Sequence, residues 1–297
     1  MLNDSLRPAR DDARTFWRLV FMCRKRALIA TVLAPIALAL ATPVFAADPP
    51  KADAGKTAKP APAPEPIKAS PQQRAEARRL DPLAQAAFWG AEFEVDPADA
   101  EAGAGLAWSL RALGRADEAA IAATKGLIAH PDHTGLLLEL ARAHIARGQG
   151  FYAIEPARKV AALSPKDWRP LTLLGVAYEQ AERDEEAEAA HRQAIALAPN
   201  EATPIANYAM HLAAKGDLAG AEAQLRRAVT LPSAGIQVRQ NLALVVGLQG
   251  RLPEAEKLVR ADLPPEQVAN NLAYLRAAVG QAGQARSWDA MRAGGGR

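Results

Sequence analysis

The sequence predicts an all-α protein: a right-handed superhelical solenoid of antiparallel helix pairs, with five full repeats and capping helices at both ends. Three observations support this. The composition is 49% hydrophobic but only 5% aromatic, which suits close helix packing better than a β-sandwich. Small residues recur with a period of 34 positions, and glycine and proline recur at fixed places between them. Such a period indicates stacked helical units rather than a single globular core.

Residues 1–46 have the three parts of a secretory signal peptide. The basic stretch 24–26 precedes an uncharged run over 27–47, and small residues lie where a signal peptidase would cut. We expect export with cleavage after Ala46. The competing interpretation is an uncleaved membrane anchor, because about 20 apolar residues can span a bilayer. Met22 directly precedes the basic stretch and is an alternative start.

Residues 47–70 are rich in Pro, Ala and Lys and have almost no bulky apolar side chains. Such a segment cannot bury enough surface to fold, and its prolines favour extended polyproline II. It is interpreted as a disordered tether. The only cysteine, Cys23, lies before the apolar run. The expected mature chain therefore forms no disulfide, and it is not an evident lipoprotein.

The net charge of +3 belongs to the leader. Residues 1–46 hold seven Lys or Arg and three Asp, which leaves a net charge of −1 for residues 47–297. Binding to a phosphate backbone needs clustered positive charge. We therefore expect no nucleic-acid partner, and membrane association only through a protein partner or an uncleaved leader.

Five windows of 34 residues, starting at 100, 134, 168, 202 and 236, follow one another without insertion over residues 100–269. Positions 8, 20 and 27 of the windows are Ala or Gly in thirteen of fifteen cases, with Val160 and Asp262 as the exceptions. Two helices cross closely only where side chains are small. These positions therefore predict the seam within and between helix pairs.

Glycine and proline mark the ends of the expected helices. Position 15 is Gly114, Gly148, Gly216 and Gly250, where a left-handed residue ends the first helix. The third unit has Glu182 at this position, which leaves its turn geometry open. Position 32 is Pro131, Pro165 and Pro199, after the second helix.

This pattern resembles the tetratricopeptide repeat family. The fullest match is in the third unit, at Leu174, Gly175, Tyr178, Ala187, Ala194 and Pro199. Residues 71–99 are expected to form N-terminal capping helices, at about 71–80 and 82–95. Pro265 opens a further helix that we expect to end at about Gly280; its capping part is assigned to 270–282, and a disordered tail to 283–297.

The resemblance implies that positions 2, 5, 9 and 12 of each first helix line a concave, partner-binding groove. The candidate contact residues are Trp108, Arg111, Leu138, Arg142, Ile145, Val176, Glu179, Met210, Gln240 and Leu244. For Leu138, Ile145 and Val176, packing between repeats is an equal alternative, whereas Trp108 and Met210 favour partner contact. The groove lacks the Lys/Asn set with which chaperone-type repeats hold a terminal carboxylate. It suits an amphipathic helix or an extended apolar peptide.

No catalytic residue, cofactor or metal site is expected, and the chain is not predicted to be an enzyme. His130 and His133 flank a Pro-Asp loop without a nearby third ligand. These two are interpreted as ordinary surface histidines, and the five histidines of the chain as scattered: His130, His133, His144, His191 and His211. The acidic run 182–188 is interpreted as a solvated outer face.

The C-terminal region, residues 236–280, carries a second resemblance. Its matching segments are Gln240-Asn241-Leu242-Ala243-Leu244, Gly247-Leu248-Gln249-Gly250-Arg251, Glu254-Ala255-Glu256, Asp262-Leu263-Pro264-Pro265 and Asn270-Asn271-Leu272-Ala273-Tyr274-Leu275. They resemble the C-terminal half of the TadD proteins of the tight-adherence (Flp) pilus system. This implies a periplasmic or outer-membrane-associated factor that helps the secretin ring assemble. The absent lipobox leaves the outer-membrane anchoring open.

We therefore expect an exported scaffold that holds a secretin or another pilus component in its groove. The alternative is a general periplasmic adaptor or chaperone of the same fold, serving another envelope complex. No residues remain to build a fused transferase or protease domain.

Overall fold

A computed structural model describes residues 68–294, with side chains described for 68–280. The predicted leader and nearly all of the predicted tether lie outside this range. Within it the chain is all helical, and the prediction of a helical solenoid is confirmed. The helices are α2 (Pro71–Ala77), α3 (Pro82–Val95), α4 (Ala100–Ala112), α5 (Ala116–Ala129), α6 (Thr134–Ala146), α7 (Gly150–Leu163), α8 (Trp168–Gln180), α9 (Asp184–Leu197), α10 (Ala202–Ala214), α11 (Leu218–Val229), α12 (Ile236–Leu248), α13 (Leu252–Val259) and α14 (Pro265–Gly294).

The first helix of every unit begins where its 34-residue window begins, and α4, α6, α8, α10 and α12 are these first helices. The small residues of the seam are buried, and Ala107, Ala141, Ala209 and their counterparts have almost no exposed surface. The core is therefore a ladder of alanine contacts filled out by larger side chains such as Leu136, Ile205 and Leu225.

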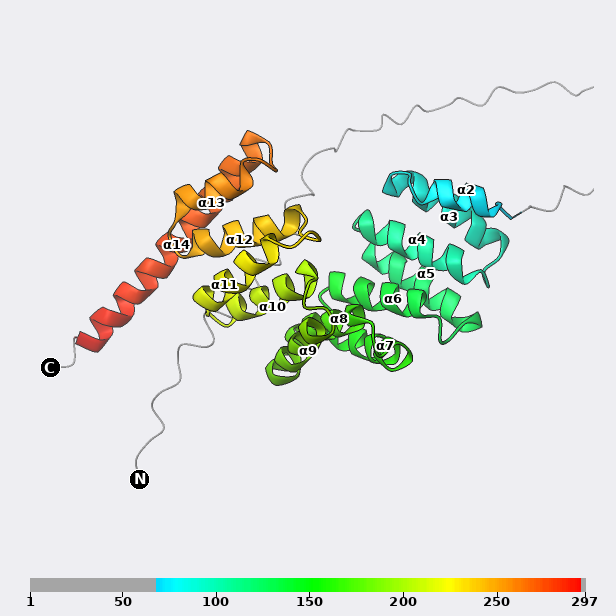
Figure 1. The fold of residues 1–297 in the computed structure, drawn as a ribbon, viewed down its shortest axis with the longest axis horizontal. Coiled ribbons are helices and arrows are strands. Elements are labelled where there is room, and N and C mark those ends of the chain that lie inside the picture. Colours follow the sequence, from blue (N-terminus) through cyan, green and yellow to red (C-terminus); the bar gives the residue numbers. More distant parts are fainter. Residues whose placement is uncertain (1–67, 295–297) are drawn as a thin grey trace, which may run out of the picture.

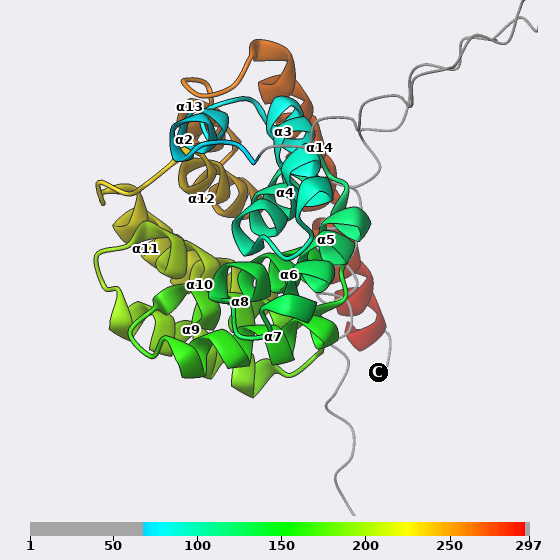
Figure 2. The ribbon, with the colours of Figure 1, turned by 90° about the vertical axis from the view of Figure 1, so that its right-hand side faces the viewer.

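The stack curves because its two sets of helices pack differently. Each first helix packs on the first helix of the next unit, whereas within residues 68–294 no second helix packs on the next second helix. The first helices therefore crowd together on the inner side of an arc that runs from α2 to α14 (Figure 1). Figure 2 shows α5, α7, α9 and α11 on the outside of that arc.

The turn of the third unit keeps the geometry of the others despite its missing glycine. The four glycines at position 15 have φ between 73° and 89°, and Glu182 has φ 60°. The Arg183 N–H donates to the Tyr178 carbonyl at 2.9 Å, as the Arg115 N–H donates to the Leu110 carbonyl at 2.8 Å in the first unit. A non-glycine residue in this conformation is strained.

The two ends of the stack differ from the expected boundaries. Helix α2 ends at Ala77 rather than near residue 80, because the Arg79 and Leu80 N–H groups donate to the carbonyls three residues before them rather than four. Helix α14 continues to Gly294, so the expected end near Gly280 is wrong, as is a tail that begins at 283. A single glycine costs a helix only about 1 kcal/mol, and good helix formers surround this one.

Helix α14 covers the last unit with an apolar stripe. Val268, Leu272 and Leu275 are buried against the core of the fourth and fifth units. Leu275 lies so close to Gly247 that a Cβ atom there would come within 2.4 Å of its Cδ1. In the described part of the chain, no helix has the length and apolar character needed to cross a membrane.

Candidate functional site

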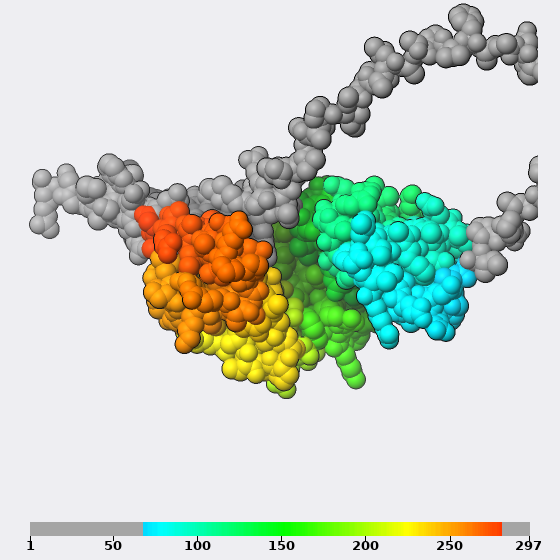
Figure 3. Space-filling model, turned by 90° about the horizontal axis from the view of Figure 1, so that it is seen from above, coloured from blue at the N-terminus to red at the C-terminus, as the bar shows by residue number. Residues whose placement is uncertain are grey.

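The inner side of the arc is hollow. Figure 3 shows a cleft between the N-terminal arm, formed by α2 to α5, and the C-terminal arm, formed by α12 to α14. Trp108 of α4 is 39% exposed, a large fraction for an indole in a first helix. It is the predicted contact residue with the clearest free apolar surface.

Most of the other predicted apolar contacts pack into the solenoid. Leu138 is buried in a core cluster, so it packs between repeats rather than presenting a surface to a partner. Ile145 packs against the core around the third unit, and Met210 and Leu244 pack against the core of the last two units. Val176 and Gln240 are partly exposed. The apolar run expected along the groove is therefore shorter than its residue list suggested.

Arg111 and Arg142, two predicted contacts, meet at a carboxylate that was not singled out. Glu139 of α6 accepts a hydrogen bond from Arg111 Nε at 2.9 Å and from Arg142 Nη1 at 2.5 Å. The arginine side chains are 25% and 31% exposed, and that of Glu139 is 7% exposed. We call these three residues the arginine cluster. It joins the first unit to the second.

Glu179, another predicted contact, belongs to a cluster at the junction of the third and fourth units. Its Oε1 lies 2.8 Å from His191 Nε2 and 3.0 Å from His211 Nδ1. The imidazoles are 0% and 2% exposed, whereas the Glu179 side chain is 28% exposed. We call Glu179, His191 and His211 the histidine cluster. It ties α8, α9 and α10 together.

Space for the histidine cluster comes from a glycine in place of alanine at one of the small-residue positions between helices. Position 8 is alanine in the other four units but Gly175 in the third. A Cβ atom on Gly175 would lie 2.3 Å from Cε1 of His191, so the imidazole occupies the space that this side chain would take. The counterparts of His191 are Ala123, Ala157, Leu225 and Val259, and those of His211 are Ser109, Ala143, Ala177 and Val245. Large polar rings at these positions are particular to this junction.

The carboxylate of the histidine cluster is held in its charged form. Burial raises the pKa of the Glu179 carboxyl, but hydrogen bonds from His191 and His211 outweigh it and leave this pKa below its ordinary value. An ionised carboxylate only accepts hydrogen bonds, so each imidazole donates from the nitrogen that faces it. The far nitrogens, His191 Nδ1 and His211 Nε2, are buried without a hydrogen-bond partner among the described residues.

The interpretation of the histidines as scattered is therefore wrong for His191 and His211, which meet at one carboxylate and are buried. An alignment of the five units gives a signal for these two histidines. Each stands at a unit position where most other units have a small or apolar residue, and Gly175 replaces the alanine that the other units have at position 8. The other pair, His130 and His133, contacts backbone groups and does not join a cluster of this kind. His130 Nε2 lies 2.7 Å from the Ala98 carbonyl oxygen, and His133 Nδ1 accepts the Leu136 N–H at the start of α6.

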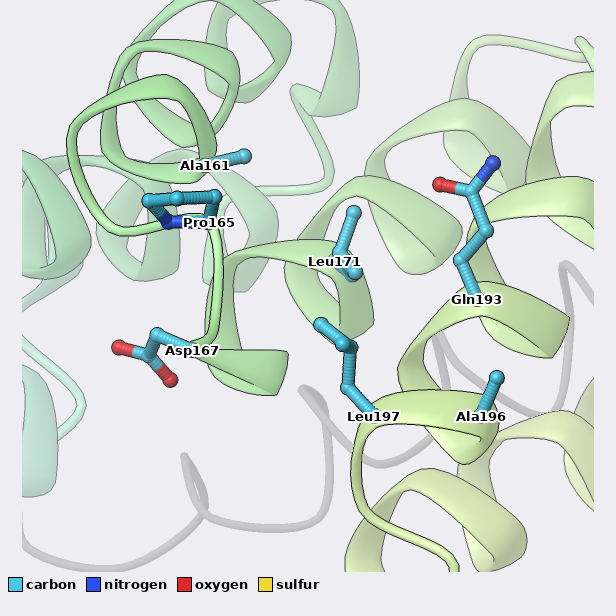
Figure 4. A pocket seen from close by; sticks show the side chains of 7 residues that line it. All are labelled: Ala161, Pro165, Asp167, Leu171, Gln193, Ala196 and Leu197. Atoms are coloured by element: carbon cyan, nitrogen blue, oxygen red, sulfur yellow. The ribbon is translucent and has the colours of Figure 1, made fainter.

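An open pocket of about 380 Å³ lies where the end of α7 meets α8 and α9 (Figure 4). Its lining is Ala161, Pro165, Asp167, Leu171, Gln193, Ala196 and Leu197. Asp167 is its only ionisable residue, and it accepts the Arg169 N–H and pairs with the Arg169 guanidinium at 2.7 Å. This pocket therefore offers no pair of groups for acid–base or nucleophilic chemistry.

Comparison with known proteins identifies the fold. No protein-family model matches the chain, and no curated protein matches it. Among solved structures, the TPR protein TTC0263 of Thermus thermophilus is 23% identical, with 60% of this chain and 99% of that chain covered and a TM-score of 0.54. A tetratricopeptide repeat protein of Parabacteroides merdae is 17% identical over 72% and 85% of the two chains, also with a TM-score of 0.54. In the APC/C hetero-tetramer Cut9–Hcn1, this chain covers 40% of the matched chain, at 21% identity and a TM-score of 0.51. The chain thus has the tetratricopeptide repeat fold.

Proposed function

We propose that this protein is a non-catalytic scaffold that holds a segment of a partner protein in the cleft between its two arms. The observation that carries the proposal is the exposed Trp108 on an inner helix of a hollow solenoid. Exposed aromatic side chains at a concave surface are typical anchors for a partner, since they bury a large area when bound.

The polar residues of the inner face support a partner of low charge. Arg111 and Arg142 already share the Glu139 carboxylate, and Glu179 already accepts from two imidazoles. A strongly acidic tail would have to compete with Glu139 for its cations. A short apolar or amphipathic segment that covers Trp108 would leave these pairs intact.

The narrower proposal is a role in the periplasm, in assembly of the secretin ring of a tight-adherence pilus. It rests on the resemblance of residues 236–280 to TadD proteins and on the export signal read in residues 1–46. The same scaffold in another envelope complex is the alternative.

The experiment is site-specific photo-crosslinking in cells. One probe replaces Trp108 and another replaces Gln240, which lies in α12 of the opposite arm and is only partly exposed. The matched control replaces Ile128 of α5, which is 81% exposed on an outer helix. We expect one protein to be captured from both inner positions and not from Ile128, and capture to fail in a Trp108→Ala variant probed at Gln240.

A captured secretin or pilus subunit supports the narrower proposal. A cell-wall enzyme or another envelope protein captured at both inner positions supports the scaffold and rejects the pilus role. Capture only from Ile128, or equal capture with Trp108→Ala, rejects the groove as the binding site.

A further inference from the structure

The histidine cluster has the composition and spacing of a three-ligand transition-metal site. Two imidazole nitrogens and one carboxylate oxygen lie within 4.8 Å of one another. We propose that Glu179, His191 and His211 bind a divalent late transition-metal ion of the zinc class, which fastens the third unit to the fourth.

The spacing is close to what such an ion needs. Zinc bonds to imidazole nitrogen and carboxylate oxygen are about 2.0–2.1 Å long, which places tetrahedral donors roughly 3.3 Å apart. Glu179 Oε1 is 2.8 Å from His191 Nε2 and 3.0 Å from His211 Nδ1. A shift of a few tenths of an ångström would open these two separations to that value, and the two nitrogens lie within 4.8 Å of each other. The 28% exposed Glu179 side chain provides the approach from solvent.

The charge of the cluster also favours a cation. With neutral imidazoles the three side chains carry one negative charge, and in the described part of the chain the ion pairs of Glu179 are those with His191 and His211. A carboxylate that is largely withdrawn from water without a full counter-charge is costly. A bound divalent ion would change the net charge of the cluster from −1 to +1. Each imidazole would then coordinate the ion through the lone pair of the nitrogen that faces Glu179. Its proton would lie on the far nitrogen.

The donor set selects the class of ion. Imidazole binds Zn²⁺, Cu²⁺, Ni²⁺, Co²⁺ and Fe²⁺, whereas Mg²⁺ and Ca²⁺ require mostly oxygen ligands. Three protein ligands leave a fourth position for water or for a group of another molecule. Because the ligands come from α8, α9 and α10, the ion would restrain the angle between two units at the middle of the arc.

The test uses the untagged full chain, with Cys23→Ser in every variant to remove the thiol from competition. After treatment with a chelator, the protein is titrated with Co²⁺, whose visible absorption reports tetrahedral coordination, and Zn²⁺ is then added as competitor. We expect one Co²⁺ per chain, displaced by Zn²⁺ and not by Mg²⁺. We also expect Zn²⁺ at a hundredfold excess over its Kd to raise Tm by on the order of 5 °C.

Two variants remove a ligand. His211→Ala installs the residue found at that position in α6 and α8, and Glu179→Gln keeps the shape of the side chain if the alanine variant folds poorly. Each should weaken binding at least about 100-fold, since even changes to groups behind the ligands cost 10- to 100-fold. The control is His130→Ala with His133→Ser, which removes the surface histidines and keeps a capping side chain for α6.

Unchanged Co²⁺ affinity in both His211→Ala and Glu179→Gln overturns the proposal. So does loss of binding in the His130/His133 control, or the absence of one-to-one Co²⁺ binding to the unsubstituted cluster.

Discussion

The histidine cluster and the arginine cluster place one carboxylate between two basic side chains at different junctions of the same solenoid. Glu139 accepts from Arg111 and Arg142, whose guanidinium groups reach solvent and always carry charge. Glu179 accepts from two enclosed imidazoles that each retain a buried nitrogen without a partner among the described residues. The first arrangement satisfies its groups and has no lone pair for a cation on its basic side chains. The second brings two imidazole nitrogens, which can each present a lone pair, to one carboxylate oxygen, and that makes it a candidate ligand site.

The largest expected effect comes from removing each carboxylate. Glu179→Ala should lower the free energy of unfolding by about 3 kcal/mol, because two enclosed imidazoles lose the acceptor that satisfies them. Glu139→Ala should cost only about 1 kcal/mol, since both arginines can turn to water. Urea unfolding of both variants with a chelator present measures the difference. Equal losses of unfolding free energy would show that enclosing the basic side chains makes no difference between the two clusters.

Gly175→Ala should cost about 2 kcal/mol, because the new methyl group enters the space of the His191 ring. The double variant Gly175→Ala/His191→Ala copies the pair found in the first two units, Ala107 with Ala123 and Ala141 with Ala157. It should recover part of that loss. A double-mutant cycle from thermal unfolding gives the coupling, and strict additivity would contradict the packing described here.

Acid should act on a third carboxylate, Glu222 of the outer helix α11, which pairs with Arg226 and Arg251. A hydrogen bond from Arg251 lowers the pKa of Glu222 to about 2; burial opposes this, while Gln249 and Arg226 add to it. A depressed pKa stabilises the fold above the ordinary value of 4.5, and the stabilisation is lost as pH falls through the folded value. Glu222→Gln should therefore lower Tm by about 2–4 °C at pH 7, corresponding to about 1 kcal/mol.

The control for this prediction is the same pair of Tm measurements repeated at lower pH. The Tm difference between Glu222→Gln and the unsubstituted protein should shrink steadily below pH 4.5. A difference that stays constant down to about pH 2.5, close to the folded value, would mean that the carboxylate charge contributes nothing.

The smallest effect is a gain. Glu182→Gly should stabilise the protein by about 1 kcal/mol, because glycine adopts the φ of 60° without the steric penalty that glutamate suffers. Thermal unfolding measures it, with Gly148→Ala as the opposite change at the same position of the second unit. A loss of stability in Glu182→Gly would show that the glutamate side chain contributes more than the strain removes.

The groove was less accessible to sequence reasoning than the repeats. Position within the unit selected Trp108, which has free surface, and also Leu138, which is enclosed. Position 5 of the second unit packs against neighbouring helices, whereas position 9 of the first unit keeps free surface, because local side-chain size decides how closely successive units approach. Arg111 and Arg142 were recognised without Glu139, the residue that joins them.

The sequence by itself determined the helices, their order and their turns, because these depend on local features repeated every 34 residues: small seam residues, a left-handed turn residue and a proline after the second helix. Repetition turned weak local signals into a strong one. Only the tertiary structure decided that Glu179, His191 and His211 meet, because they come from three helices and their contact depends on how two units cross. Burial and the lack of a further partner among the described residues are properties of that crossing, and they separate the candidate metal site from three scattered polar residues.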